Sequence, residues 1–97
     1  MEWKLFATLA ETADGNAVAV DDEDAATVGD ALDALLAAEP ALADQVLTSG
    51  DSVAEGELRD HLRLLVDGRD PFREGEGLDE PVDTDAELAL FPPVSGG

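Results

Sequence analysis

The group with the clearest chemical potential in this chain is its terminal carboxylate, on Gly97, which follows Gly96. Glycine has no Cβ, so the carboxylate can enter a narrow channel and can be attacked from either side. The six-residue tail that leads to it contains Pro92, Pro93 and Val94, and it has no charged side chain although 30% of all residues are charged. At about 3.3 Å per residue, such a tail can reach roughly 20 Å beyond a folded body. We therefore predict that a partner enzyme activates and transfers this carboxylate.

The single histidine, His61, does not belong to a recognisable catalytic set. Asp60 and Arg63 lie near it, but no serine with an identifiable spacing accompanies it and the chain has no cysteine. Covalent catalysis requires a nucleophile within reach of a base. We interpret His61 as an ordinary polar residue at the start of a strand and predict no catalytic residue.

Three aspartates, at positions 79, 83 and 85, resemble the ligands of a calcium-binding loop. Such a loop requires a glycine at its turn, where this chain has Thr84, and it ends in a glutamate that is missing here. The glycines at positions 68, 75 and 77 do not follow a phosphate-binding pattern. Without cysteine, thiolate zinc sites are also excluded. We predict that the protein binds no metal and no cofactor of its own.

The charge balance is strongly acidic, because 24 Asp and Glu residues face 5 Lys and Arg residues and give a formal net charge of -19. Nucleic acid and anionic lipid are poor partners for such a surface. Self-repulsion destabilises the fold in ordinary buffer, whereas at about 1 M salt the Debye length shrinks to roughly 3 Å. The composition therefore predicts a protein adapted to concentrated salt. An acidic adaptor from an ordinary-salt organism is the alternative.

The chain length and the apolar runs favour a single small domain outside the membrane. Ninety-seven residues suit one hydrophobic core. The apolar runs are much shorter than the roughly 18 residues that span a bilayer, and the N-terminus lacks the pattern of a signal peptide. We expect a cytoplasmic monomer.

The N-terminal half predicts a hairpin followed by a helix. Side chains alternate with a period of two from Met1 to Glu11, and Ala17 to Val20 form a second short strand after a turn. The acidic run at 21–24 is then expected to be a solvated loop. Thr27 and Asp30 resemble a capping box. The apolar stripe of the helix consists of Val28, Ala31, Leu32, Leu35 and Leu36.

The helix should end at Glu39, because Pro40 disfavours helical geometry in the residue before it. Leu42 and Val46 then predict a short turn on the core. The composition of residues 48–56 indicates a surface loop.

The C-terminal half predicts two more strands. Leu62 to Val66 ends at Asp67-Gly68, a dipeptide that favours a tight hairpin turn. We expect residues 69–82 to be mostly loop, with one brief strand at most and with Phe72, Leu78 and Val82 as the available apolar anchors. Glu87 to Phe91 forms the last strand, with Leu88 and Leu90 on one face and Phe91 directed outward.

This order of elements predicts an α+β fold, in which a mixed four- to five-stranded sheet is covered on one face by one main helix. Residues 1–91 would form the domain and residues 92–97 a flexible tail. Phe91 with the first residues of the tail makes a small exposed apolar patch, and such patches often mark docking surfaces.

Several segments resemble a known family. The ending from Leu88 to Gly97 closely resembles that of the small archaeal ubiquitin-like modifier proteins and of the small subunit of molybdopterin synthase. Leu5 to Glu11, Thr27 to Leu35 and Leu65 to Arg69 are similar to the first strand, the helix and a later hairpin of the same family. The segments at 43–60 and 70–85 are less similar.

The resemblance implies a β-grasp, ubiquitin-like fold and a carrier function, in a halophilic archaeon. A ubiquitin-type activating enzyme would use ATP to adenylate the carboxylate of Gly97, with Gly96 giving steric clearance and Phe91, Pro92, Pro93 and Val94 docking the partner. The adenylate would then become a thiocarboxylate, for the molybdopterin synthase large subunit or for transfer RNA thiolation. Alternatively, a lysine of a target protein would capture it as an isopeptide bond.

Two alternatives to a carrier remain. One is a passive acidic adaptor whose tail ends in two glycines by chance, and the other is an enzyme, for which the sequence offers no catalytic set. The sequence also leaves open whether Lys4, the single lysine, is itself modified.

Overall fold

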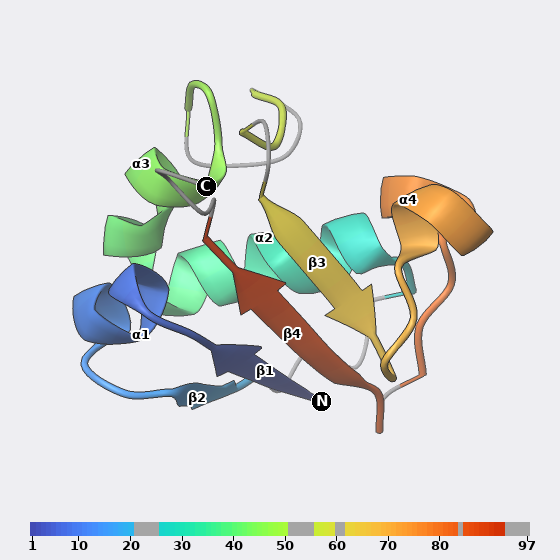
Figure 1. Ribbon diagram of the computed structural model, residues 1–97, viewed down its shortest axis with the longest axis horizontal. Helices are drawn as coiled ribbons and strands as arrows, with labels where there is room; N and C mark the ends of the chain where they lie inside the picture. Colours follow the sequence, from blue (N-terminus) through green and yellow to red (C-terminus); the bar gives the residue numbers. More distant parts are fainter. Residues whose placement is uncertain (21–25, 51–55, 60–61, 84, 93–97) are drawn as a thin grey trace.

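The computed structural model describes residues 1–20, 26–50, 56–59, 62–83 and 85–92. Within these ranges the chain forms a four-stranded sheet with the order β2-β1-β4-β3 (Figure 1). The strands are β1 (Glu2–Leu5), β2 (Ala17–Ala19), β3 (Arg63–Val66) and β4 (Glu87–Phe91). β1 pairs with β4 in parallel, whereas the β1–β2 and β3–β4 pairs are antiparallel. The sheet is therefore mixed, as predicted.

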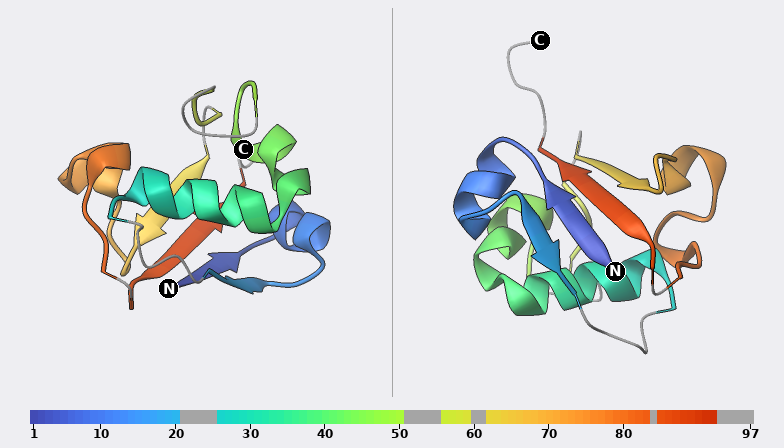
Figure 2. Two further views of the ribbon diagram at one scale, coloured as in Figure 1. Left: turned by 180° about the vertical axis from the view of Figure 1, so that it is seen from behind. Right: turned by 90° about the horizontal axis from the view of Figure 1, so that it is seen from below.

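The main helix, α2 (Val28–Ala38), lies along one face of the sheet, and the opposite face carries no helix in the described parts of the chain (Figure 2). The predicted capping box is confirmed. The Asp30 amide donates to Thr27 Oγ1 at 3.2 Å, and the Thr27 amide donates to Asp30 Oδ2 at 3.3 Å. The helix ends at Ala38, and Glu39 has a non-helical φ of -132°. This agrees with the predicted end of the helix before Pro40.

The core lies between α2 and the sheet and contains the predicted apolar stripe. Trp3 is fully buried there, and its indole nitrogen donates to the Ala31 carbonyl at 3.1 Å, so its one polar atom is satisfied. The other large, fully buried side chains are Leu5, Leu9, Leu32, Leu35, Leu42, Leu47, Leu64, Leu88, Leu90, Val28 and Val46. Leu42 and Val46 belong to η1 (Pro40–Leu42) and α3 (Ala43–Val46), which confirms the short turn predicted on the core.

The prediction of one strand from Met1 to Glu11 was wrong in its second half. β1 ends at Leu5, and a short helix, α1 (Thr8–Ala13), follows. Leu9, which continues the alternation of Trp3 and Leu5 in the sequence, lies on this helix and is fully buried. Its burial therefore does not require a longer strand. β1 and β2 pair as predicted, but α1 connects them in place of a simple turn.

The prediction for residues 69–82 also requires correction. The segment contains α4 (Pro71–Glu74) and η2 (Gly77–Asp79), and its strand-like features are isolated bridges, between Val66 and Arg69 and between Thr27 and Pro81. Asp70 begins α4, because its carboxylate accepts from the Phe72 amide at 2.9 Å. Phe72 is not a core anchor, since 48% of it is exposed.

The hairpin between β3 and the following segment forms at the predicted dipeptide. Asp67 and Gly68 have φ values of 51° and 84°, the left-handed pair that a type I′ turn requires. Val66 and Arg69 exchange backbone hydrogen bonds of 2.7 and 2.9 Å across the turn.

Among the residues that the structure describes, none of the helices has the length and the apolar character that crossing a lipid bilayer requires. The expectations for the acidic run at 21–24, for His61, for Thr84 and for the centre of the 48–56 loop lie outside the described residues.

Candidate functional site

The site is built around the end of β4, the strand that leads to the C-terminus. β4 lies between β1 and β3, so its backbone is held on both sides. Phe91 ends the strand and Pro92 follows it, and both are half-buried. Pro93, Val94, Gly96 and Gly97 lie outside the described residues. The structure thus describes the two residues at the base of the tail, and the reactive end remains a prediction.

Alternation along β4 places Phe91 on the face of the sheet opposite α2. Leu88 and Leu90 are fully buried against the helix, whereas Glu87 is exposed and Phe91 is half-buried. Phe91 is less exposed than predicted because its ring stacks on Phe6. The two ring centroids are 4.3 Å apart and the ring planes differ by 10°.

Phe6 is the site residue that the sequence interpretation missed. It is 40% exposed and follows the last residue of β1, next to β4. The alternation of side chains along β1 could have indicated its position. Trp3 and Leu5 are buried on one face of the sheet, so Lys4 and Phe6 are expected on the other face. Nothing in the sequence pattern alone placed Phe6 beside Phe91, because that requires parallel pairing of the first and last strands.

A strained turn fixes the direction in which the chain leaves Phe6. Ala7 has a φ of 53° and a ψ of -126°, a conformation that favours glycine. The Leu9 amide donates to the Phe6 carbonyl at 3.2 Å across this turn. Gln45 of α3 donates to the Thr12 hydroxyl and so ties α1 to the body of the protein. These contacts hold the backbone that carries Phe6.

The strand register identifies the other members of this surface. Leu65 of β3 and Lys4 of β1 lie opposite Ala89 on its two sides, and Arg63 lies opposite Phe91. Leu65 and Ala89 are half-buried, whereas Lys4 and Arg63 are exposed. We call this surface the open face, and it consists of Lys4, Phe6, Arg63, Leu65, Ala89 and Phe91. It is apolar at its centre and carries a cation on each side.

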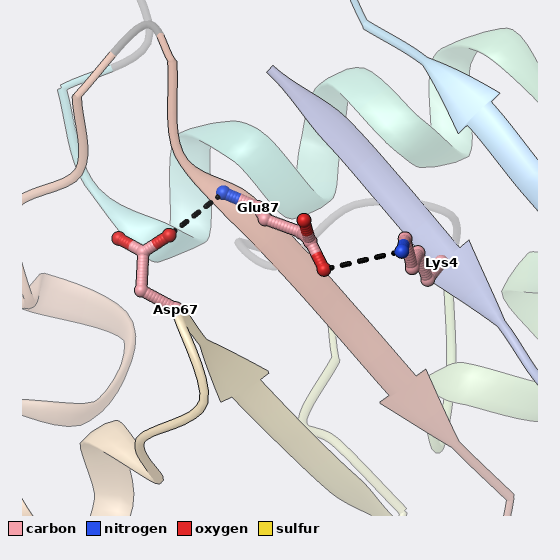
Figure 3. A network of polar contacts seen from close by, with 3 residues as sticks. All are labelled: Lys4, Asp67 and Glu87. Carbon is pink, nitrogen blue, oxygen red and sulfur yellow. Dashed lines mark hydrogen bonds and ion pairs between the residues drawn. The ribbon is translucent and has the colours of Figure 1, made fainter.

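Polar contacts fix the start of β4 at the other end of the strand (Figure 3). Lys4 Nζ forms an ion pair with Glu87 Oε1 at 3.3 Å, in which the two side chains are 46% and 60% exposed. The Glu87 amide donates to Asp67 Oδ1 at 3.0 Å, and the Asp67 amide donates back to the Glu87 carbonyl at 2.8 Å. Three strands are thereby joined through Glu87, which sets the register that brings Phe91 beside Phe6.

A hollow of about 560 Å³ lies next to the open face. Lys4, Phe6 and Asn16 contribute to its wall, together with Leu5, Ala7, Ala10 and Ala17. Within the described residues, no group of three His, Cys, Asp or Glu side chains could hold a metal ion.

Comparison with known proteins gives consistent results. The ThiS family model matches residues 3–97. Small archaeal modifier protein 1 of Haloferax volcanii is 54% identical over 97 residues, which are 100% of each chain. A crystal structure of SAMP1 from Haloferax volcanii matches with a TM-score of 0.82 at 52% identity, and it covers 100% of this chain and 98% of that one.

A solution structure of small archaeal modifier protein 1 from Methanosarcina acetivorans also matches, with a TM-score of 0.80 at 33% identity. It covers 99% of this chain and 94% of that one. These neighbours are ubiquitin-like β-grasp proteins, so the predicted fold class is confirmed.

Proposed function

The chain belongs to the ThiS family, and we propose that it is a ubiquitin-like protein modifier and sulfur carrier whose reactive group is the carboxylate of Gly97. The observation that carries the proposal is the full-length similarity to a small archaeal modifier protein, together with a terminal Gly-Gly that follows a firmly held strand. The protein supplies the group that reacts and a surface for docking. A partner supplies the catalysis.

The proposed chemistry begins with activation by a ubiquitin-type enzyme. The Gly97 carboxylate attacks the α-phosphorus of ATP, pyrophosphate leaves, and an acyl adenylate forms. A sulfur donor then displaces AMP to give a thiocarboxylate, or a lysine amine displaces AMP to give an isopeptide bond with loss of a proton. Gly96 and Gly97 provide the steric clearance that this attack requires. ATP belongs to the partner's site, and we assign no cofactor to this chain.

The open face is the proposed docking surface for the activating enzyme. Its aromatic pair offers flat apolar area close to the base of the tail, and aromatic residues are enriched among the residues that dominate binding. Phe91 lies on this face, Pro92 follows it in the chain, and Phe6 extends the proposed site. The docking roles of Phe91, Pro92, Pro93 and Val94 remain sequence-based predictions. Arg63 is exposed on this face, and its guanidinium would suit a carboxylate of the partner.

The two roles of the activated carboxylate have different downstream partners. A thiocarboxylate would serve the large subunit of molybdopterin synthase or an enzyme that thiolates transfer RNA. An isopeptide bond would join the carrier to lysines of target proteins. We place these reactions in the cytoplasm, where ATP is present, with the carrier acting as a monomer.

Deletion of Gly96 and Gly97 tests the carrier function against the adaptor alternative. We expect the shortened protein to fold with an unchanged melting temperature and to lose every adduct in cells. An adaptor would retain its binding partners after this deletion. Adduct formation by the shortened protein would contradict the proposal.

Mass spectrometry separates the two roles. Replacement of one terminal oxygen by sulfur in the intact protein indicates sulfur transfer. For protein tagging, no Lys or Arg occurs between Arg73 and the C-terminus, so trypsin would leave a long branch on the target lysine. The Ser95→Arg variant places a cleavage site beside the glycines and leaves only Gly-Gly on the lysine. Activation of this variant is compared with that of the natural protein as a control.

A further inference from the structure

The carrier itself contains one amine suited to capture an activated carboxylate. Lys4 is the single lysine of the chain, and its side chain is 46% exposed. The other primary amine, at Met1, donates to the Val20 carbonyl at 3.3 Å, and the Met1 carbonyl accepts from the Val20 amide at 3.0 Å. The Met1 amine is thus held at the side of the sheet, whereas Lys4 extends from it.

Lys4 stands on the surface proposed to dock the activating enzyme. It lies opposite Ala89, two residues before Phe91 on the neighbouring strand. From strand geometry, the Cα atoms of Lys4 and Phe91 are about 8 Å apart. Lys4 also shares the hollow of the open face with Phe6. Its ion pair with Glu87 keeps the amine over the sheet.

The size of an ordinary interface makes this position restrictive. A stable interface covers about 800 Å² on each partner, which corresponds to a disc with a radius of roughly 16 Å. Lys4 therefore falls within the footprint of an interface centred on Phe91. A chain attached to the Lys4 amine would emerge inside that footprint and would also remove a positive charge from the open face.

We propose that Lys4 accepts the carboxylate of a second copy of this chain, and that the modified copy can then no longer be activated. The inference rests on the proposed carrier function. The neutral Lys4 amine attacks the Gly97 carbonyl of the adenylated copy, AMP leaves, the isopeptide bond forms, and the amine proton is released to solvent. The tail of the donor is consumed, and the acceptor keeps its own tail but loses its docking surface. The free tail of a linked pair could therefore not be adenylated, although the Lys4 amine of the donor copy would remain open to a further adenylated copy.

The first experiment tests the acceptor. Purified carrier is incubated with its activating enzyme and ATP, and the products are analysed by intact mass and peptide mapping. We expect linked pairs with the branch on Lys4 and none from the Lys4→Arg variant, whose arginine can retain the ion pair with Glu87. Adenylation of the purified linked pair, seen as ATP–pyrophosphate exchange equal to that of the unlinked carrier, would overturn the proposal. A monomer lighter by one water would indicate capture by the chain's own tail and would also overturn it.

The second experiment tests the loss of activation. Carrier is treated with an amine-reactive ester of a short polyethylene glycol acid, which modifies Lys4 and the Met1 amine. The Lys4→Arg variant treated in the same way is modified only at Met1 and serves as the matched control. We compare the ATP–pyrophosphate exchange of each treated protein with that of the same protein untreated. We expect treatment to lower the exchange of the natural carrier about tenfold or more and to have no effect on that of the variant, whatever the starting value for the variant.

The outcomes separate this inference from the carrier function. Full exchange with treated natural carrier would overturn the inference and leave the carrier function intact. Absence of exchange with untreated carrier would overturn the carrier function, and the inference with it. An acetyl ester in place of the larger reagent shows how much of the loss arises from charge alone.

Discussion

Truncation of the aromatic pair should affect stability and activation in separable ways. Phe6 is 40% exposed. Full burial of a phenylalanine contributes roughly 1.5–3 kcal/mol, so the buried part of Phe6 should contribute about 1–2 kcal/mol. Stacking at 4.3 Å adds a coupling of about 0.5–1.5 kcal/mol. We therefore expect Phe6→Ala and Phe91→Ala each to lower the free energy of unfolding by about 1.5–3.5 kcal/mol. The double variant should lose less than the sum.

Urea unfolding in concentrated KCl measures all four members of this double-mutant cycle. The same proteins are then assayed for pyrophosphate exchange, under conditions where each remains folded. We expect the KM for each single variant to rise about tenfold, as the loss of roughly 1.4 kcal/mol of docking energy predicts.

Phe72→Ala provides the matched control for activation. Phe72 has a comparable exposure of 48% but lies on α4, outside the open face. We expect its truncation to leave the KM unchanged. Additive stability effects of Phe6→Ala and Phe91→Ala would refute the stacking argument. A KM that changes equally for Phe72→Ala and Phe91→Ala would refute the docking argument.

Three further predictions concern stability. Hydrogen bonds from the Ala26 amide and from Thr27 lower the pKa of Asp30, although burial opposes them. The natural protein should therefore have a higher free energy of unfolding in urea than Asp30→Asn near neutral pH, and this difference should disappear as the pH falls below about 4. Thr27→Ala should lower the free energy of unfolding by about 1 kcal/mol at pH 7. Ala7→Gly should stabilise the fold by about 1 kcal/mol, because glycine adopts the positive φ of this position without strain. Ala10→Gly, inside α1, should destabilise the fold by about 1 kcal/mol. Equal effects of the two substitutions on the free energy of unfolding would refute the strain argument. The melting temperature should rise between about 0.1 M and multi-molar KCl through screening of like charges, and a flat or falling response would contradict adaptation to salt.

Local chemistry predicted those elements whose signals lie within a few residues. The capping residues Thr27 and Asp30 and the following apolar stripe identified α2. Asp67-Gly68 identified the hairpin because both residues tolerate positive φ. The bounds of β4, Glu87–Phe91, agree with the prediction because alternation and the following prolines act together.

The errors arose where a short apolar pattern fits two structures. Leu9 continues the alternation of β1, but it is equally buried from the first turn of α1, and a run of this length does not separate a strand from a helix. The start of α4 depends on the Asp70 cap and on Pro71 at the first helical position, a signal obscured by the surrounding glycines and acids. In the first segment, burial of Leu9 against the core decided the outcome.

Parallel pairing of the first and last strands brings the proposed docking surface to the base of the tail. Because β1 and β4 run in the same direction, their C-terminal ends lie side by side. The residue after β1 therefore meets the last residue of β4, and Phe6 stacks on Phe91 although the two are far apart in the sequence. A partner that holds this pair is positioned at the base of the tail, within its reach of roughly 20 Å. The same geometry places Lys4, two residues before Phe6, on the docking surface, so a bond formed at that amine acts on the site where the next activation would begin.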